Sequence, residues 1–393
     1  MNQRDRRALE ILRQLGGRPA TPFFEAGPAR YVEQCLREMG VDHRRDPFGN
    51  IIAHHNRGEY PHRPAVALVA HMDHPGFEIV EAKGRRAVAR AVGGVPVASL
   101  VKPTPVLVLT LDGRRIPAIT ARHETTTDPG DRRAEQLVNL VMEGPVELDP
   151  PAPVVFDLPD FELDGDTIRM RALDDLAGCA GILAALERTV VDGAECDVYG
   201  VFTRAEEGGL YGARLLAESG ILPADTIVVS VESSSVIPGV AQGEGPVIRT
   251  GDAASTFDAG AEQVLIAARG ALRGRDAEFK SQRQLMSGGV CEATAFAAFG
   301  YPVTGLAFPL GNYHNATTGI GDLEGGVAAE YIELSDFLDG VDLLTEAARS
   351  AAPPDDTSLR RLMGDVPDEV RQRLEASNPL LQNLERDGLT GTP

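Results

Sequence analysis

The sequence predicts an α/β protein with a mostly parallel sheet covered by helices on both faces, and with a small inserted β-rich domain. Valine-rich runs such as residues 65–70 and 303–308 are typical of strands buried on both faces. They alternate with helical stretches over residues 165–350, a pattern that favours a parallel sheet. Between residues 76 and 164, short apolar runs alternate with Gly, Pro and Asp turns, which indicates a separate β-rich region.

Helices and strands follow from the spacing of apolar residues. Intervals of three or four positions predict helices, as at Leu176, Cys179, Ile182, Leu183 and Leu186. The predicted helices span residues 5–16, 29–39, 175–188, 212–218, 292–299 and 334–349. Short apolar runs between turn residues predict strands. The predicted strands span residues 51–53, 65–70, 87–92, 106–111, 115–119, 166–170, 197–202, 226–231 and 303–308.

The change from alternating helices and strands to short strands, and then to a polar segment, divides the chain into four parts. With 393 residues the chain is too long for a comfortable single core. We expect an α/β domain in two pieces, residues 1–75 and 165–350, which carries the functional residues. Residues 76–164 form the inserted domain, which would serve assembly or substrate access. Residues 351–393 form a polar C-terminal tail with short helices.

The charge balance excludes some classes of partner. The chain has 58 Asp and Glu against 38 Lys and Arg, a formal net charge of -20. Such a surface repels phosphate groups and anionic lipids, so we expect neither a nucleic-acid nor a membrane partner. No run approaches the ~20 consecutive apolar residues that span a bilayer. Much of the acidic surplus also serves as a solvated coat that keeps a protein soluble.

The compartment is predicted from the N-terminus and the cysteines. Residues 1–13 are charged and lack the apolar core of a signal peptide. The 4 cysteines show no CxxC pair and no framework spacing. We therefore expect a cytoplasmic protein with reduced thiols.

Metal-ligand residue types follow the predicted strands at several places. They are His71 with Asp73, Asp174 with Asp175, Glu206 with Glu207, Glu232, and His314. Ligands of open α/β sheets bind at the carboxyl ends of the strands, so these distant residues can converge in one crevice. Two imidazoles and three carboxylates form a mixed shell that suits zinc, or cobalt or manganese. The sequence thus predicts two divalent metal ions per chain.

Each of these motifs has an ordinary alternative when taken alone. An isolated His71–Asp73 pair would fit a surface turn, and either aspartate of Asp174-Asp175 could simply cap the following helix. Two adjacent aspartates allow one to cap and the other to bridge two cations. Of Glu206 and Glu207, one could bind metal while the other acts as general base toward a metal-bound water. No GxSxG elbow or Walker-type phosphate loop competes with this interpretation.

At these residues the sequence resembles the dinuclear zinc metallo-aminopeptidases that include the tetrahedral and glutamyl aminopeptidases. The resemblance covers roughly residues 5–349, with the motifs in the same order. The matching motifs are Val69–Asp73 with Gly76-Phe77, Ala172–Asp175 with Ala177–Cys179, and Val201–Thr203 with Glu206–Gly208 and Tyr211–Ala213. It implies a zinc-peptidase-like fold, a peptide substrate and a homo-oligomer, often a dodecamer.

The resemblance also implies a role for each residue. Asp174 would bridge the two metals, with His71 and Glu232 completing one site and Glu207 and His314 the other. Of the two remaining residues, one would take part in the reaction and the other would support a metal ligand. Glu206 would be the general base, and the carboxylate of Asp73 would hold the imidazole of the first metal site.

Three positions depart from the family pattern. Leu176 stands where the family usually has Arg, and His74 where it usually has Glu. Residues 287–292 differ from the usual Gly-Gly-Thr-Asp. We expect an exopeptidase, an aminopeptidase that attacks the peptide bond with a metal-bound hydroxide. A carboxypeptidase or N-acyl amino-acid deacylase on the same metals stays open as an alternative, as does a non-catalytic descendant.

Overall fold

The computed structural model describes all residues except 59–63, 111, 124–134, 145–146, 351–363 and 387–393. Residue 111, at the end of one predicted strand, and much of the predicted tail therefore lie outside the described residues. The chain divides into two units, Met1–Pro353 and Pro354–Pro393. Among the described residues, no helix combines the length and the apolar character needed to cross a membrane.

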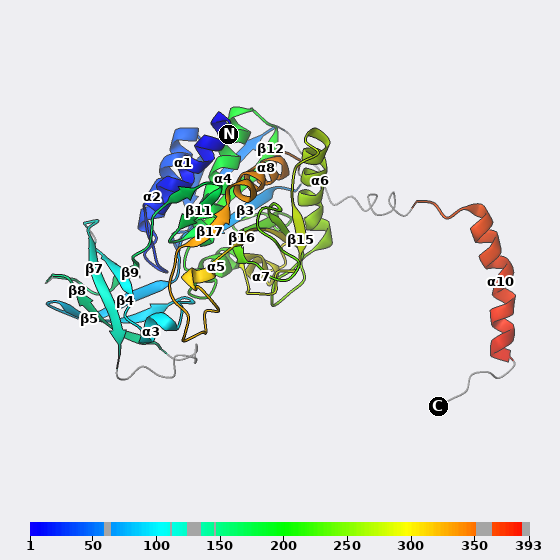
Figure 1. The fold of residues 1–393 in the computed structure, drawn as a ribbon. Coiled ribbons are helices and arrows are strands. Elements are labelled where there is room, and N and C mark those ends of the chain that lie inside the picture. The colour runs from blue at the N-terminus through cyan, green and yellow to red at the C-terminus, as the bar shows by residue number, and fades with distance from the viewer. Residues whose placement is uncertain (59–63, 111, 124–134, 145–146, 351–363, 387–393) are drawn as a thin grey trace. The chain divides into compact units, whose positions relative to one another are not determined.

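The centre of the first unit is a sheet of eight strands in the order β1-β2-β12-β3-β13-β16-β14-β15 (Figure 1). These strands are β1 (Asp42–Arg45), β2 (Ile51–Arg57), β3 (Val66–His71), β12 (Cys196–Thr203), β13 (Ile227–Ser235), β14 (Val247–Arg249), β15 (Gln282–Gln284) and β16 (Val303–Leu310). The pairings β12–β3–β13–β16 and β14–β15 are parallel, and the other pairings are antiparallel. The sheet is mixed, so the expected mostly parallel sheet holds only at its centre.

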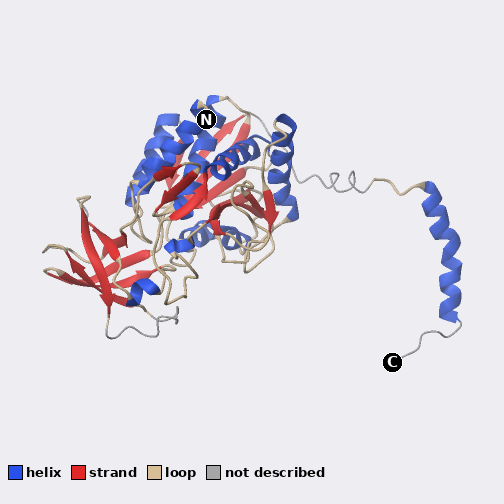
Figure 2. Cartoon of the chain, in the orientation of Figure 1, coloured by secondary structure: helices blue, strands red, loops and turns tan. Residues whose placement is uncertain are grey.

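Helices cover both faces of this sheet, as Figure 2 shows. They are α1 (Gln3–Gly16), α2 (Ala26–Met39), α4 (Leu173–Val191), α5 (Tyr211–Ser219), α6 (Ala259–Arg275), α7 (Glu292–Ala297) and α8 (Leu334–Ser350). The first five residues of β3, 66–70, are all apolar because both faces of this strand are covered. Leu68 and Ala70 pack in the cluster that holds α1, α4 and α8, while Ala67 and Val69 pack on the other face with α5 and α7.

The segment after β3 closes into an antiparallel barrel in the order β4-β5-β8-β7-β6-β9. Its strands are β4 (Gly76–Lys83), β5 (Arg86–Val92), β6 (Pro105–Leu109), β7 (Arg115–Arg122), β8 (Leu137–Met142) and β9 (Ala152–Phe156), with the short helix α3 (Ala98–Val101) between β5 and β6. The barrel has a core of its own, in which Phe77 and Phe156 meet edge to face. Closure removes the exposed sheet edges of a β-rich segment.

A small sheet joins two distant parts of the chain. Strands β10 (Glu162–Asp164), β11 (Thr167–Met170) and β17 (Glu330–Glu333) pair antiparallel in that order. This pairing brings the residues that precede α4 against the residues that follow β16. The described residues of the second unit include the helix α10 (Asp368–Arg386).

The sequence missed one long helix of the main domain. Helix α6 (Ala259–Arg275) begins at Asp258, whose side chain accepts a hydrogen bond from the N–H of Ala261. Its apolar residues are mostly alanines among Gly, Gln and Arg, so the apolar stripe is weak. Only the contacts of α6 with α8 and β16 determine which of its faces is buried.

Candidate metal centre

The predicted metal-ligand residues meet at the carboxyl ends of the central strands. His71 is the last residue of β3, Glu206 and Glu207 follow β12, and Glu232 lies in β13. Glu206 is the predicted base, and the other two predicted ligands are Asp174, in the first turn of α4, and His314, which follows β16 in the short 3-10 helix η1 (Tyr313–Asn315). Parallel β12, β3, β13 and β16 end at the same edge, which is why residues so distant in sequence converge.

Their ligand atoms form two groups that share one carboxylate. Atoms of His71, Asp174 and Glu232 all lie within 4.8 Å of one another, and so do atoms of Asp174, Glu207 and His314. A further group within the same distance joins the first imidazole to Glu206 and Glu207. The two groups that share Asp174 contain the same residues as the two sites that the resemblance implies.

The imidazole of His71 is oriented by a main-chain carbonyl. Its Nδ1 lies 3.0 Å from the carbonyl oxygen of Asp73, which can only accept, so Nδ1 carries the hydrogen. Nε2 then faces oxygens of Asp174 at 3.3 Å, Glu206 at 3.9 Å and Glu232 at 4.0 Å. An imidazole nitrogen and three carboxylates that face one another in a buried site need positive charge between them, either a proton on Nε2 or a metal ion in its place.

His314 has the same arrangement on the other side of Asp174. Its Nδ1 lies 3.0 Å from the carbonyl oxygen of Gly94, in the loop after β5. Nε2 faces Glu207 at 3.0 Å and Asp174 at 3.6 Å. A Cβ added at Gly94 would lie 2.5 Å from Nδ1, so only glycine permits this contact. The barrel side of the chain thus contributes to the orientation of this imidazole.

Asp174 and Asp175 point in different directions, and their peptide bond is cis. Asp175 accepts a hydrogen bond from the N–H of Gly178, which caps the start of α4. The Oδ1 atom of Asp174 is buried and has no hydrogen-bond donor among the described residues. A buried carboxylate oxygen without a donor is costly, and a metal ion would remove that cost.

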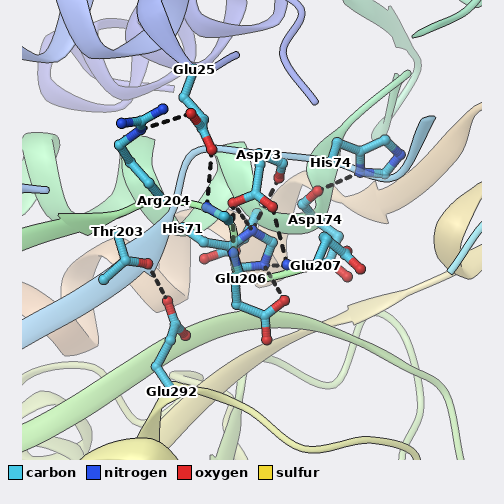
Figure 3. Close-up of polar contacts among 12 residues, drawn as sticks. Glu25, His71, Asp73, His74, Asp174, Thr203, Arg204, Glu206, Glu207 and Glu292 are labelled. Atoms are coloured by element: carbon cyan, nitrogen blue, oxygen red, sulfur yellow. Dashed lines mark hydrogen bonds and ion pairs between the residues drawn. The ribbon is translucent and has the colours of Figure 1, made fainter. Parts of the chain in front are cut away.

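The carboxylate of Asp73 orients the two glutamates rather than the imidazole. Its Oδ1 and Oδ2 accept the N–H groups of Glu206 and Glu207, both at 3.0 Å, as Figure 3 shows. Its Oδ1 lies 3.8 Å from Nδ1 of His71, whose hydrogen bond goes to the carbonyl of Asp73 instead. The expectation that this carboxylate holds His71 is therefore replaced by a role in fixing the turn after β12.

Electrostatics in this cluster are dominated by buried carboxylates. Burial alone would lower the pKa of His71, but Glu206 and Asp174 raise it by more than that, so the pKa of His71 lies well above its usual value. Burial also raises the pKa of Glu206 well above the usual range, with His71 opposing this shift and Glu207 adding to it. Both pKa shifts reflect an excess of buried carboxylates, whose negative charge a divalent cation would offset.

Comparison with known proteins agrees with this geometry. The model of the M42 glutamyl aminopeptidase family matches residues 49–327, a range that includes all of the clustered residues. The chain belongs to the M42 glutamyl aminopeptidase family. A relative from Acetivibrio thermocellus, described as a candidate aminopeptidase, is 28% identical over 239 residues. That match spans 56% of this chain and 65% of the relative.

Solved structures share the fold of this M42 protein. A TET aminopeptidase from a marine-sediment Thaumarchaeota archaeon has a TM-score of 0.71 at 19% identity, covering 88% of this chain and 96% of that one. The TET1 peptidase of Pyrococcus horikoshii has a TM-score of 0.69 at 22% identity, covering 87% of this chain and 99% of that one.

Two buried glutamates that the sequence did not single out position the M42 site. Glu330 in β17 accepts the N–H groups of Leu173, Asp174 and His314, at 2.8, 3.0 and 2.9 Å. It thereby ties the backbones of two predicted ligands together. Glu25 accepts the N–H of Ala205, which has a left-handed φ of 51° just before the glutamate pair. Nothing in the sequence around Glu330, in a short strand, or Glu25, just before a helix, indicated that these residues position the site.

Leu176, His74 and Glu292, which all lie at departures from the family pattern, are buried. Leu176 packs in the core beside α1 and α8. His74 contacts the carbonyl oxygen of Asp174 at 2.6 Å and Oδ1 of Asn315 at 2.9 Å, so it braces the site instead of facing the shared centre. Glu292 accepts hydrogen bonds from the hydroxyls of Thr203 and Ser230.

Proposed function

We propose that this protein is a metal-dependent aminopeptidase that holds two divalent ions and removes N-terminal residues from peptides. One observation carries the proposal. Asp174 is shared by two groups of ligand atoms, and each group contains an imidazole whose Nδ1 contacts a main-chain carbonyl while its Nε2 faces carboxylates. Membership in the M42 family supports the same activity.

The residues divide the work of holding the ions. His71 and Glu232 hold one ion and Glu207 and His314 the other, with Asp174 bridging them. This mixed nitrogen and oxygen shell suits zinc, and also cobalt or manganese. Two such ions would activate a water as nucleophile and polarise the scissile carbonyl.

Glu206 is the general base in this proposal. Its carboxylate lies beside His71, outside both groups that share Asp174, and its side chain is 11% exposed. It takes the proton of the attacking water at a carboxylate oxygen and returns it to the leaving amine nitrogen. Asp73 fixes its position through the N–H of the same residue.

We also propose that the protein forms a homo-oligomer to which the barrel, within the expected inserted domain 76–164, contributes. The TET1 peptidase of Pyrococcus horikoshii is described as assembling into a tetrahedron or a large octahedral shell. The same barrel reaches the metal centre through Gly94. Its role in assembly can be tested by the molecular mass of the protein in solution.

The deciding experiment combines metal content with a substrate panel. We expect about two zinc, cobalt or manganese ions per chain, together with chelator-sensitive release of N-terminal residues from free-amine peptides. Matched peptides with an acylated N-terminus should resist cleavage. Turnover of acylated or C-terminally reported substrates alone would replace the aminopeptidase assignment, and absence of metal after reconstitution would overturn the site.

A further inference from the structure

A small cavity adjoins the proposed metal centre and contains a buried arginine. It has a volume of about 30 Å³, and its lining includes Glu232, Arg249, Cys291 and Tyr313. Room of this size holds about two water-sized atoms or one small ion. Any ligand of this cavity is therefore small.

The charge of Arg249 is not answered within the protein. The residue is only 2% exposed, and its Nε and Nη1 atoms are buried without a hydrogen-bond acceptor among the described residues. A guanidinium keeps its charge in proteins and has five N–H donors. Leaving charged donors unpaired inside a protein is costly. Such a group is expected to have an acceptor in the working protein.

The nearby carboxylates are engaged with other groups. Glu292 accepts the hydroxyls of Thr203, as Figure 3 shows, and of Ser230. Asp252 accepts three N–H groups and one hydroxyl at hydrogen-bond distance. Glu232 belongs to the proposed metal shell. The acceptor for the guanidinium therefore has to come from elsewhere.

One wall of the cavity belongs to the segment that departs from the family pattern. Gly288, Gly289, Val290 and Cys291 line the cavity in this order. Set against the usual Gly-Gly-Thr-Asp, this order puts a cysteine in the place of the aspartate. A thiol is ordinarily uncharged near neutral pH and accepts hydrogen bonds only weakly. The cavity thus combines a buried positive charge with a wall that has a thiol in place of a carboxylate.

The register of the sheet explains how Arg249 reaches this cavity. On the two sides of β16, Gly305 pairs with Ser230 of β13 and with Arg249 of β14. Directly paired residues share a face of the sheet, and Glu232 shares it too because it lies two positions after Ser230. A Cβ at Gly305 would lie 3.3 Å from Cδ of Arg249. Glycine at this position therefore leaves room for the arginine side chain over β16.

We propose that this cavity binds a small monovalent inorganic anion of the size of chloride, which pairs with Arg249. The anion takes the part of the carboxylate that Cys291 does not supply. Ser234 and Ser235 also line the cavity and offer hydroxyl donors to the same ion. This inference goes beyond the proposed function and does not depend on it, because it concerns a resident ion and not the peptide substrate.

Thermal unfolding in different salts tests the site. Chloride replaces isethionate, a larger monovalent anion, at constant ionic strength, and the thermal midpoint of the metal-loaded protein is measured. We expect saturating chloride to raise the wild-type midpoint by about 2 °C or more, because an ion that binds only the folded state stabilises it. Arg249→Met should lose this response. Arg283→Met, a half-exposed arginine of β15 that pairs with Glu262, is the control and should keep it.

Two outcomes of this experiment would overturn the inference. One is a wild-type midpoint that does not respond to chloride. The other is an equal response in wild type and Arg249→Met, which would place the ion at the metals or on the surface. General salt effects act on all variants alike, so the difference between the variants is the quantity to compare.

Substitutions at Cys291 test the same site without removing the arginine. Cys291→Asp supplies a carboxylate beside Arg249, so we expect the chloride response to disappear although the variant stays folded. Cys291→Ser is the matched control, since a hydroxyl leaves the guanidinium charge unanswered, and it should respond to chloride as the wild type does. A full response in Cys291→Asp would contradict the proposal.

Bromide in place of chloride locates the ion directly. Crystals of the metal-loaded protein grown in bromide should show an anomalous peak within hydrogen-bonding distance of the Arg249 guanidinium, and crystals of Cys291→Asp should lack it. Peaks at other places alone would show an adventitious ion only and overturn the inference. None of these measurements needs turnover. An active aminopeptidase without the chloride response would therefore contradict this inference alone, and an inactive protein with the response would contradict only the proposed function.

Discussion

Two imidazoles in this protein have Nδ1 held by a main-chain carbonyl. The carbonyl oxygens of Asp73 and Gly94 accept from Nδ1 of His71 and His314, so Nε2 of each ring is available as a ligand. In many metal sites a carboxylate has this role, and here the carboxylate of Asp73 supports Glu206 and Glu207 instead. A main-chain carbonyl therefore orients each imidazole without adding a charge to the buried site.

Glu206→Gln should separate proton transfer from metal binding. The amide keeps the shape of the side chain but cannot take a proton, so we expect kcat to fall by ~100-fold or more. Metal content, measured by elemental analysis, should stay that of the wild type because Glu206 lies outside both groups that share Asp174. An active Glu206→Gln protein would contradict the assignment of the base.

Short elements carry much of the organisation of this site. Strand β17 has only four residues, yet its first one, Glu330, accepts three N–H groups from the segments that carry Asp174 and His314. His314 itself has a left-handed φ of 54°, which a non-glycine residue adopts only when its surroundings impose it. The strand therefore acts as a clamp between α4 and η1.

Glu330→Gln should weaken metal binding although Glu330 is not a ligand in the proposal. An amide nitrogen facing an N–H group leaves a donor unpaired, so the backbones of Asp174 and His314 shift. We expect metal affinity to fall by about 10- to 100-fold, as for other groups that support ligands, measured by competition with a chelator. Glu333→Gln in the same strand, where Glu333 accepts from Thr167, is the control. Equal affinities for both variants would contradict the clamp.

Helix α8 carries a carboxylate whose ionisation opposes folding. Burial, with Asp342 adding, raises the pKa of Asp339 to about 6. The folded state therefore disfavours the ionised form: the penalty is absent below the unfolded value of ~3.8, grows between ~3.8 and 6, and is complete above 6. Asp339→Asn should thus raise the free energy of unfolding by about 1 kcal/mol at pH 7, after allowance for solvent screening.

Chemical unfolding at two pH values tests this prediction. The gain from Asp339→Asn should be smaller at pH 4, where the wild-type carboxyl is largely protonated in the folded state. Asp225→Asn, in the exposed loop before β13, provides the same substitution away from the acidic helix. A gain that is the same at pH 4 and pH 7 would show that charge is not its source.

At the scale of the whole molecule, the metal centre joins parts that are far apart in sequence. Its residues come from β3, α4, the end of β12, β13 and η1, and Gly94 adds a contact from the barrel. Many buried carboxylates repel one another there without a cation. The ions of the proposed function should therefore stabilise the fold of unit Met1–Pro353 as well as supply chemistry.

Metal removal should lower the thermal midpoint. Binding to the folded state alone stabilises by about 2.7 kcal/mol when free metal is 100 times its Kd, which corresponds to a shift of several degrees. We expect the midpoint to fall on addition of a chelator and to recover with zinc. Asp174→Ala, which removes the shared carboxylate, should lose this response. A chelator-insensitive midpoint in wild-type protein with measured metal content would contradict the coupling.

The sequence alone determined the parts of the site whose residue types are distinctive. Buried strands appear as continuous apolar runs because both faces are covered, and the histidines and acids that end them stand out for that reason. Alternation of strands and helices then predicted that their carboxyl ends meet. The family, the barrel region as β-rich, and the candidate residues His71, Asp174, Glu207, Glu232 and His314 follow from such local patterns.

The tertiary structure alone decided how neighbouring groups share their tasks. Adjacent residues such as Asp174 and Asp175 look alike in sequence, and only contacts with His314 and Gly178 distinguish them. Glu330 and Glu25 gave no signal because a single charged residue is ordinary until its burial and partners are known. Hydrogen bonds and charge pairs act over a few ångströms between segments distant in the chain, so no local pattern encodes them.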